Sequence, residues 1–284
     1  MLAAKDLPGF EERLAQVKGV RIRYLVAGAG APVVLLHGLG GAASNWVGLA
    51  PELARAARVL VPELPGHGGS SPLAAAPNLN PFADAVAGVL RHEGMSGAAV
   101  VGHSFGGSVA LRLGMRHASL VRSIVLASAA GISSRRRAAV FGLRLTALLK
   151  PGRRIARYRH QIARSPFLRT LVFGGWGTPD PAAMSPRAAE GFLTGPGRHS
   201  DTLSAALALL REDPRVELHR TDCPCLVLWG ARDTQVGVAD AFEYARRLRA
   251  SLRVIADCGH LLIGERPDAC LDAIEEFLLD GQDR

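Results

Sequence analysis

The chain has 284 residues, of which 48% are hydrophobic and 21% are charged, and its formal net charge is +9. This length allows one large α/β domain or a domain that carries an insertion, and the apolar content supplies a sizeable core. No apolar run approaches the length of a membrane span, because glycine, arginine or proline interrupts each one. Residues 1–23 lack the basic start and apolar stretch of a secretory signal, so we expect a cytoplasmic protein.

Short apolar runs alternate with helix-length segments over most of the chain. Near-continuous apolar strands in this arrangement are typical of a mostly parallel central sheet flanked by helices on both faces, which is an α/β fold. A final helix is predicted from an apolar stripe through Cys270, Ile274 and Phe277, with Gly281 as its stop. The predicted strands are Val20–Ala27, Val33–Leu36, Arg58–Val61, Ala98–Val101, Ser123–Leu126, Leu226–Trp229 and Leu252–Ala256.

The alternation stops between Ser128 and Cys223. We predict a mainly helical lid at residues 133–215, inserted between two parts of the core at residues 1–132 and 216–284. Such an insertion would lie over the carboxyl ends of the strands, where α/β proteins bind ligands. Two helical stripes support it, one through Phe141, Leu145, Leu148 and Leu149, the other through Ile155, Tyr158 and Ile162.

Arginine dominates the charge of the predicted lid, because no Asp or Glu occurs between Glu93 and Asp180. Three interpretations stay open: recognition of an anionic substrate, contact with an anionic membrane, or a solvated surface that reflects genomic base composition. Nucleic acid is not an expected partner, since few aromatic residues interleave with the cations. The basic residues of the lid within this acid-free stretch are Arg135, Arg136, Arg137, Arg144, Lys150, Arg153, Arg154, Arg157, Arg159, Arg164 and Arg169.

The four cysteines have no spacing typical of a disulfide framework or a metal site. Cys223 and Cys225 bracket the start of a strand, where neighbouring side chains point to opposite faces. Cys258 and His260 would need a second pair of ligands to hold a metal, and the sequence offers none. We therefore predict reduced, structural cysteines and no metal site.

The sequence Gly102-His103-Ser104-Phe105-Gly106 is the only Gly-x-Ser-x-Gly match in the chain. It follows the predicted strand at residues 98–101 and precedes a predicted helix. The glycines have no side chains to clash at a sharp bend, so the turn can aim the Ser104 hydroxyl outward. This arrangement predicts a nucleophile elbow with Ser104 as the nucleophile.

A serine hydroxyl needs a base to take its proton. In the fold that carries this elbow the order along the chain is serine, acid, histidine. His260 follows a late strand and satisfies this order. Asp233 follows the strand at residues 226–229, whereas no carboxylate follows the strand at residues 123–126 for more than fifty residues. We predict Asp233 as the acid, and its alternative role is a cap for the next helix.

Two backbone N–H groups are predicted to bind the oxyanion that forms when a carbonyl is attacked. One belongs to Phe105, and the other belongs to Leu39 or, if the turn is shifted, to Gly40. His37 lies in the same loop, and we expect it to stiffen the turn rather than to react.

The motifs together resemble the α/β-hydrolase fold superfamily over nearly the full length of the chain. The resemblance is strongest to its lid-bearing serine esterase and lipase-like branch. It implies cleavage of carboxylic esters through an acyl-enzyme, a small ester substrate of apolar or anionic character, and no cofactor. The features that carry it are His37-Gly38, Asn45-Trp46, Pro65-Gly66-His67-Gly68 with Ser70, the elbow, Gly230-Ala231-Arg232-Asp233 and Gly259-His260.

Several alternatives on the same scaffold stay open. Dehalogenases and epoxide hydrolases of this fold use Asp as nucleophile, and Ser104 argues against both. Carbon–carbon bond hydrolases commonly carry Asn before the serine and Trp after the histidine, where this chain has His103 and Leu261. An acyltransferase and a low-turnover ligand-binding protein are further alternatives. Glu63 stands where the family usually has Asp, and we expect a structural role for it.

Overall fold

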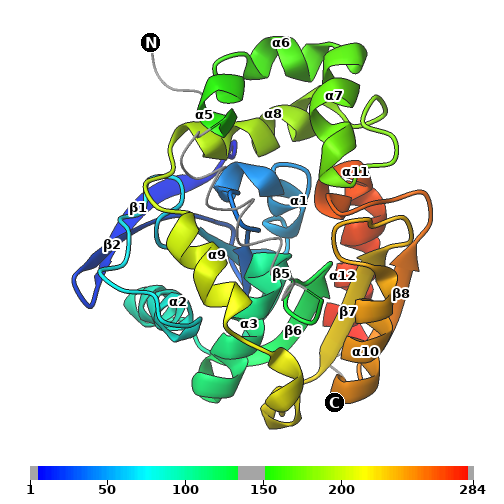
Figure 1. Cartoon of the computed structure of the whole chain (residues 1–284). Coiled ribbons are helices and arrows are strands. Elements are labelled where there is room, and N and C mark those ends of the chain that lie inside the picture. The colour runs from blue at the N-terminus through cyan, green and yellow to red at the C-terminus, as the bar shows by residue number, and fades with distance from the viewer. Residues whose placement is uncertain (1–5, 134–150, 281–284) are drawn as a thin grey trace.

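The computed structural model describes residues 6–133 and 151–280, and a central eight-stranded sheet organises them (Figure 1). The strand order is β1-β2-β4-β3-β5-β6-β7-β8; β2 pairs antiparallel with β1 and β4, and the remaining neighbours are parallel. The strands are β1 (Glu11–Val17), β2 (Val20–Ala27), β3 (Ala31–Leu36), β4 (Ala57–Pro62), β5 (Ala98–His103), β6 (Val121–Ala127), β7 (Cys225–Gly230) and β8 (Ser251–Ile255).

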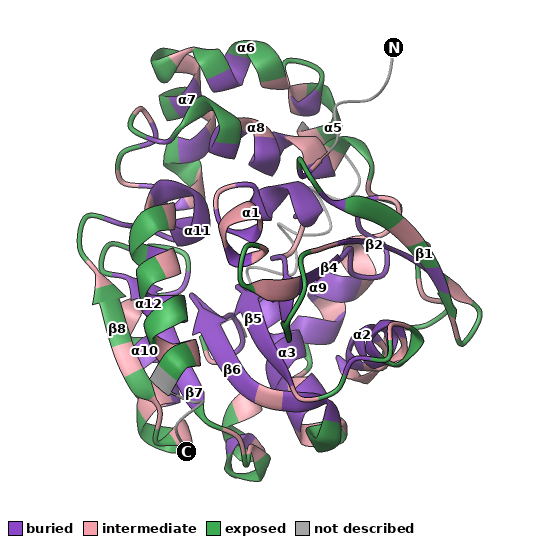
Figure 2. Cartoon of the chain, turned by 180° about the vertical axis from the view of Figure 1, so that it is seen from behind, coloured by how far each residue is buried: buried purple, intermediate pink, exposed green. Residues whose placement is uncertain are grey.

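Helices cover both faces of the sheet, as predicted. Alternate residues of β5 show why its sequence is continuously apolar: Ala98 and Val100 enter one core, while Ala99 and Val101 enter the other. α2 (Asn80–His92), α3 (Phe105–Arg116) and α10 (Val238–Leu248) pack on the first face. α1 (Ala50–Leu53), α11 (Leu262–Glu265) and α12 (Pro267–Asp280) pack on the second (Figure 2).

Each strand predicted from the sequence overlaps an observed strand, but β1 was not predicted. β1 forms a hairpin with β2 through a two-residue turn at Lys18 and Gly19, both of which have positive φ. It lies at the edge of the sheet, and within it only Ala15 is buried. Its apolar alternation is therefore too weak to be recognised from the sequence.

The described residues between β6 and β7 form helices and turns without a strand. They are called the cap below; its green part lies above the sheet in Figure 1, whereas its yellow part runs down in front of the sheet. The limits of the cap at residues 133 and 215 stay a prediction. The α-helices of the cap are α5 (Pro151–Ala156), α6 (Arg159–Arg164), α7 (Pro166–Phe173), α8 (Pro186–Thr194) and α9 (Leu203–Leu210). The described residues also contain short 3-10 helices, two in the core and four between β6 and β7. They are η1 (Ala43–Trp46), η2 (Ala118–Leu120), η3 (Gly174–Trp176), η4 (Gly195–Gly197), η5 (Pro214–Val216) and η6 (Leu218–Arg220).

Of the two helical stripes predicted for the cap, the structure describes only the second. The stripe from Phe141 to Leu149 lies outside the described residues. The predicted stripe through Ile155, Tyr158 and Ile162 was wrong, because a turn at residues 157–158 separates α5 from α6. Ile162 is buried, whereas Tyr158 precedes α6 and its side chain is exposed.

The remaining predictions about the fold concern the last helix and the cysteines. Cys270 and Ile274 are buried on α12, as the apolar stripe predicted, and Gly281 lies outside the described residues. All four cysteines are free thiols. Among the described residues no helix has the length and apolar character needed to cross a bilayer.

Candidate active site

Ser104 occupies the bend between β5 and α3. Its backbone has φ 52° and ψ −116°, a strained conformation for a residue with a side chain. A Cβ atom on Gly102 would lie 2.4 Å from the Gly106 carbonyl oxygen, and one on Gly106 would lie 2.2 Å from the Leu36 carbonyl oxygen. The two glycines of the motif are thus required by close backbone packing, and they permit the sharp bend that presents Ser104.

The structure brings together the three side chains proposed as nucleophile, base and acid. His260 Nε2 lies 3.0 Å from Ser104 Oγ, and His260 Nδ1 lies 2.8 Å from Asp233 Oδ2. All three residues are buried, and they follow β5, β7 and β8 at the carboxyl edge of the sheet. Parallel neighbouring strands end at the same edge, which is why residues far apart in the sequence meet here.

Asp233 is held as a carboxylate. Its Oδ1 accepts hydrogen bonds of 2.9 Å from the N–H groups of Gln235 and Val236, while Oδ2 faces His260. Burial by itself would raise the pKa of Asp233, but the hydrogen bond to His260 and the two backbone donors outweigh it and lower the pKa. The carboxylate can therefore orient the imidazole and stabilise its protonated form.

The loop that carries His260 is fixed by side chains that sequence reasoning missed. Glu265 accepts hydrogen bonds from the N–H groups of Gly259 and Leu261, at 3.0 and 2.9 Å. His103 Nε2 lies 2.8 Å from the carbonyl oxygen of His260. Burial raises the pKa of Glu265, which is the one acidic residue in the apolar stretch after His260. That isolation in the sequence is the signal that could have identified it.

The cap also contacts this loop. The N–H of His260 donates a hydrogen bond of 3.0 Å to the carbonyl oxygen of Gly177. A Cβ atom on Gly259 would lie 1.9 Å from the same oxygen, so the two backbones touch directly. The segment that joins η3 to α8 therefore packs on the base itself.

The loop after β3 lies beside the nucleophile. A Cβ atom on Gly38 would lie 3.2 Å from Ser104 Cβ. His37 braces the turn: its Nδ1 donates to the Gly38 carbonyl oxygen at 2.8 Å, and its Nε2 accepts from the Leu64 N–H at 3.0 Å. In the described part of the chain, the N–H groups of Leu39 and Phe105 donate to no protein acceptor. Their assignment to an oxyanion hole remains a proposal, and His37 makes the bracing contacts expected of it.

His199 links the cap to the same loop. Its Nε2 lies 2.7 Å from the Gly40 carbonyl oxygen, and its Nδ1 accepts from the N–H of Gly68 at 3.1 Å. Burial lowers the pKa of His199 to about 4, so the ring is neutral near neutral pH and can donate at one nitrogen and accept at the other. The cap thus holds two core loops in a fixed relation.

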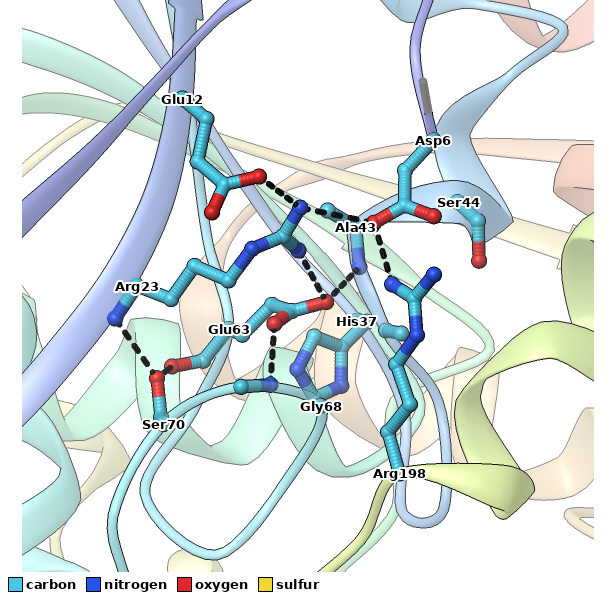
Figure 3. Close-up of polar contacts among 12 residues, drawn as sticks. Asp6, Glu12, Arg23, His37, Ala43, Ser44, Glu63, Gly68, Ser70 and Arg198 are labelled. Carbon is cyan, nitrogen blue, oxygen red and sulfur yellow. Dashed lines mark hydrogen bonds and ion pairs between the residues drawn. The ribbon is translucent and has the colours of Figure 1, made fainter. Parts of the chain in front are cut away.

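Glu63 belongs to a buried charge network shown in Figure 3. Its carboxylate is fully buried, pairs with Arg23 at 3.0 Å and accepts from the Gly69 N–H at 2.6 Å. Arg23 also pairs with Asp6 and Glu12. These contacts give Glu63 the structural role predicted for it, at the base of the loop that follows β4.

The described residues contain no group of three or more His, Cys, Asp or Glu side chains arranged to hold a metal ion. The site consists of a hydrogen-bonded Ser-His-Asp relay, the loop of Gly38 beside it, and a cap that contacts the loop of His260. This arrangement can move a proton from a hydroxyl to an imidazole.

Comparisons with known proteins place this chain in a family. The profile of a family described as "Alpha/beta hydrolase family" matches residues 33–273. A 2-hydroxymuconate semialdehyde hydrolase of Pseudomonas sp. (strain CF600) is 30% identical over 92% of this chain and 92% of its own. A pimeloyl-[acyl-carrier protein] methyl ester esterase of Aromatoleum aromaticum is 31% identical over 87% of this chain and 97% of its own.

Two further comparisons extend the range of relatives. The dihydrolipoyllysine-residue acetyltransferase component of the acetoin cleaving system of Cupriavidus necator is 32% identical over 88% of this chain, which spans 64% of that relative's length. Among solved structures, that of a bacterial membrane phospholipase A matches with a TM-score of 0.73 and 25% identity, over 97% of this chain and 88% of that one. From the family match, the sheet topology and the relatives of near-equal length, the chain belongs to the alpha/beta hydrolase family.

Proposed function

We propose that the chain is a serine hydrolase that cleaves carboxylic esters through an acyl-enzyme. The observation that carries the proposal is the relay from Ser104 Oγ to His260 Nε2 at 3.0 Å and from His260 Nδ1 to Asp233 Oδ2 at 2.8 Å. In the first step His260 takes the proton of Ser104 as Oγ attacks the ester carbonyl carbon. Asp233 stabilises the imidazolium without taking its proton.

The N–H groups of Phe105 and Leu39 bind the oxyanion of the tetrahedral intermediate in this mechanism. His260 then gives its proton to the leaving alkoxide as the carbon–oxygen bond breaks, which releases an alcohol and leaves an acyl group on Ser104. Water repeats the sequence, with His260 as its base, and the second product is a carboxylic acid. Loss of one oxyanion donor typically raises the barrier of such a reaction by about 2.7–4 kcal/mol.

Turnover of p-nitrophenyl esters of increasing acyl length tests the proposal. We expect the wild type to hydrolyse at least one of them and Ser104→Ala to lose about a millionfold in kcat with its fold intact. Ser123→Ala is the matched control, because Ser123 is a buried serine of β6 outside the relay. Mass spectrometry of the quenched wild type should show an acyl adduct on the peptide that contains Ser104. An active Ser104→Ala variant would contradict the proposal.

A second candidate is hydrolysis of a carbon–carbon bond. It is supported by the similarity to the 2-hydroxymuconate semialdehyde hydrolase, whose alignment covers 92% of both chains. Assay of 2-hydroxymuconate semialdehyde beside the ester panel decides between the two. A kcat/KM for that compound well above the value for every ester would favour the second candidate. The acetyltransferase relative motivates one added measurement, the partition of acyl product between water and an added alcohol.

A further inference from the structure

The three outermost helices of the cap carry a surface that the proposed chemistry does not use. α6 lies farthest from the sheet in Figures 1 and 2, with α5 and α7 at its two ends, while α8 contacts α6 and also η1 of the core. We call the solvent-facing side of α5, α6 and α7, together with the turn between α5 and α6, the outer cap face. It is defined by Arg154, Arg157, Tyr158, Arg164, Phe167 and Leu171.

Three large apolar side chains of the outer cap face are exposed. Phe167 is 75% exposed, Leu171 is 71% exposed and Tyr158 is 60% exposed. Phe167 and Leu171 are four residues apart on α7 and therefore lie on one side of that helix. The other large exposed hydrophobic residues in the described ranges are spread singly over β1, η5, α10, β8 and α12. Single exposed residues are ordinary, whereas a group of this kind indicates an interaction surface.

The cations of this face have no acidic partner. Arg154, Arg157 and Arg164 are exposed and make no ion pair within the described residues, and no acidic residue occurs between Glu93 and Asp180. Elsewhere on the surface Arg55 pairs with Glu52 and Arg253 pairs with Glu276, whereas Arg21, Arg187 and Arg249 are exposed and have no acidic partner among the described residues. Solvated, unpaired guanidinium groups remain available for anionic groups outside the chain.

We propose that the outer cap face docks on an anionic lipid bilayer. Phe167, Leu171 and Tyr158 would enter the interfacial region, and the arginines beside them would contact lipid phosphates. A lipid surface is favoured over an acidic protein because these side chains project from the outermost helices, and a fluid surface can close around them. The docking is peripheral and independent of the proposed hydrolysis.

Co-sedimentation with sucrose-loaded vesicles tests the proposal, with Ser104→Ala as the background so that no lipid is consumed. We expect binding to vesicles of phosphatidylcholine with phosphatidylglycerol, little binding to phosphatidylcholine alone, and release by high salt. Phe167→Ser with Leu171→Ser should weaken binding at least tenfold, whereas Phe242→Ser should not, since Phe242 is a similarly exposed residue on α10.

The charge requirement has its own matched pair of variants. Replacement of Arg154, Arg157 and Arg164 by Gln should lower the partition coefficient by about fivefold for each arginine. Replacement of Arg55, Arg232 and Arg253 by Gln removes the same charge from sites that have acidic partners and should have a small effect. Equal loss in both triple variants would assign binding to net charge alone and would overturn the docking face.

A third measurement keeps the proposal testable if a multiple variant does not fold. Phe167→Trp places a fluorophore on the face, and its emission should shift to the blue when anionic vesicles are added. No shift, together with no co-sedimentation of the parent protein, would overturn the proposal. Binding to polyglutamate without binding to vesicles would also overturn it, because the face would then fit an acidic protein.

Discussion

His103 Nε2 lies 2.8 Å from the carbonyl oxygen of His260, so the residue before the nucleophile holds the backbone of the proposed base. A carbonyl oxygen only accepts hydrogen bonds, which places the single proton of the neutral His103 ring on Nε2. Burial lowers the pKa of His103 to about 3, so the ring keeps this state through the neutral range. The elbow and the base loop are therefore coupled by a contact separate from the relay itself.

We expect His103→Leu to lower kcat by about 10–100-fold with little change in KM, because a small displacement of His260 weakens proton transfer. His103→Asn should retain more activity, since its amide keeps a donor. Steady-state kinetics on the best ester of the panel measure both variants. A Leu variant with the kcat of the wild type would show that Glu265 and the backbone contact with Gly177 suffice to position the base.

Asp233→Asn should lower kcat by about ten-thousandfold. An Asn amide facing Nδ1 donates a proton where the carboxylate accepts one, so the imidazole would carry its proton on Nε2 and could not accept that of Ser104. The hydrogen bonds from Gln235 and Val236 can persist to the Asn side-chain oxygen, so the fold should be retained. Circular dichroism controls for folding, and activity within tenfold of the wild type would refute the assigned role.

Arg23→Leu should destabilise the protein by about 3–5 kcal/mol, because it leaves the Glu63 carboxylate buried without its cation. Glu63→Gln should cost less, since the amide oxygen can still accept from Gly69 and Arg23 keeps its pairs with Asp6 and Glu12. The double variant should be less destabilised than the sum of the two single variants. Urea unfolding of all four proteins measures the coupling, and strict additivity would contradict a direct interaction.

Stability should fall as the pH drops below about 6.5, the ordinary pKa of histidine. Burial lowers the pKa of His37 to about 4 and that of His103 to about 3. Between these values and about 6.5 the unfolded chain binds protons that the folded chain does not, so each group subtracts about 1.4 kcal/mol per pH unit. Above that range both states are neutral and the effect vanishes.

Urea unfolding at neutral and mildly acidic pH measures this dependence. His37→Asn should reduce the slope of unfolding free energy against pH. His160→Gln changes an exposed histidine of α6 and serves as the control. An identical slope in wild type and His37→Asn would contradict the contribution assigned to His37.

The sequence by itself determined the parallel part of the sheet and the candidates for nucleophile, base and acid. Strands covered on both faces must be apolar at nearly every position, so β3 to β7 can be recognised in the sequence as short apolar runs. The elbow is recognisable because its bend admits only glycine at Gly102 and Gly106. Asp233 could be chosen because no other carboxylate follows a suitable strand end.

Only the tertiary structure decided what lies between these elements. β1 depends on pairing with β2, and the exposure of Tyr158 depends on the turn that separates α5 from α6. The contacts of His103 with His260 and of Arg23 with Glu63 join residues that no local pattern relates. Periodicity reports how a residue is buried along its own element, whereas a buried polar group is satisfied by whatever partner the folded chain brings to it.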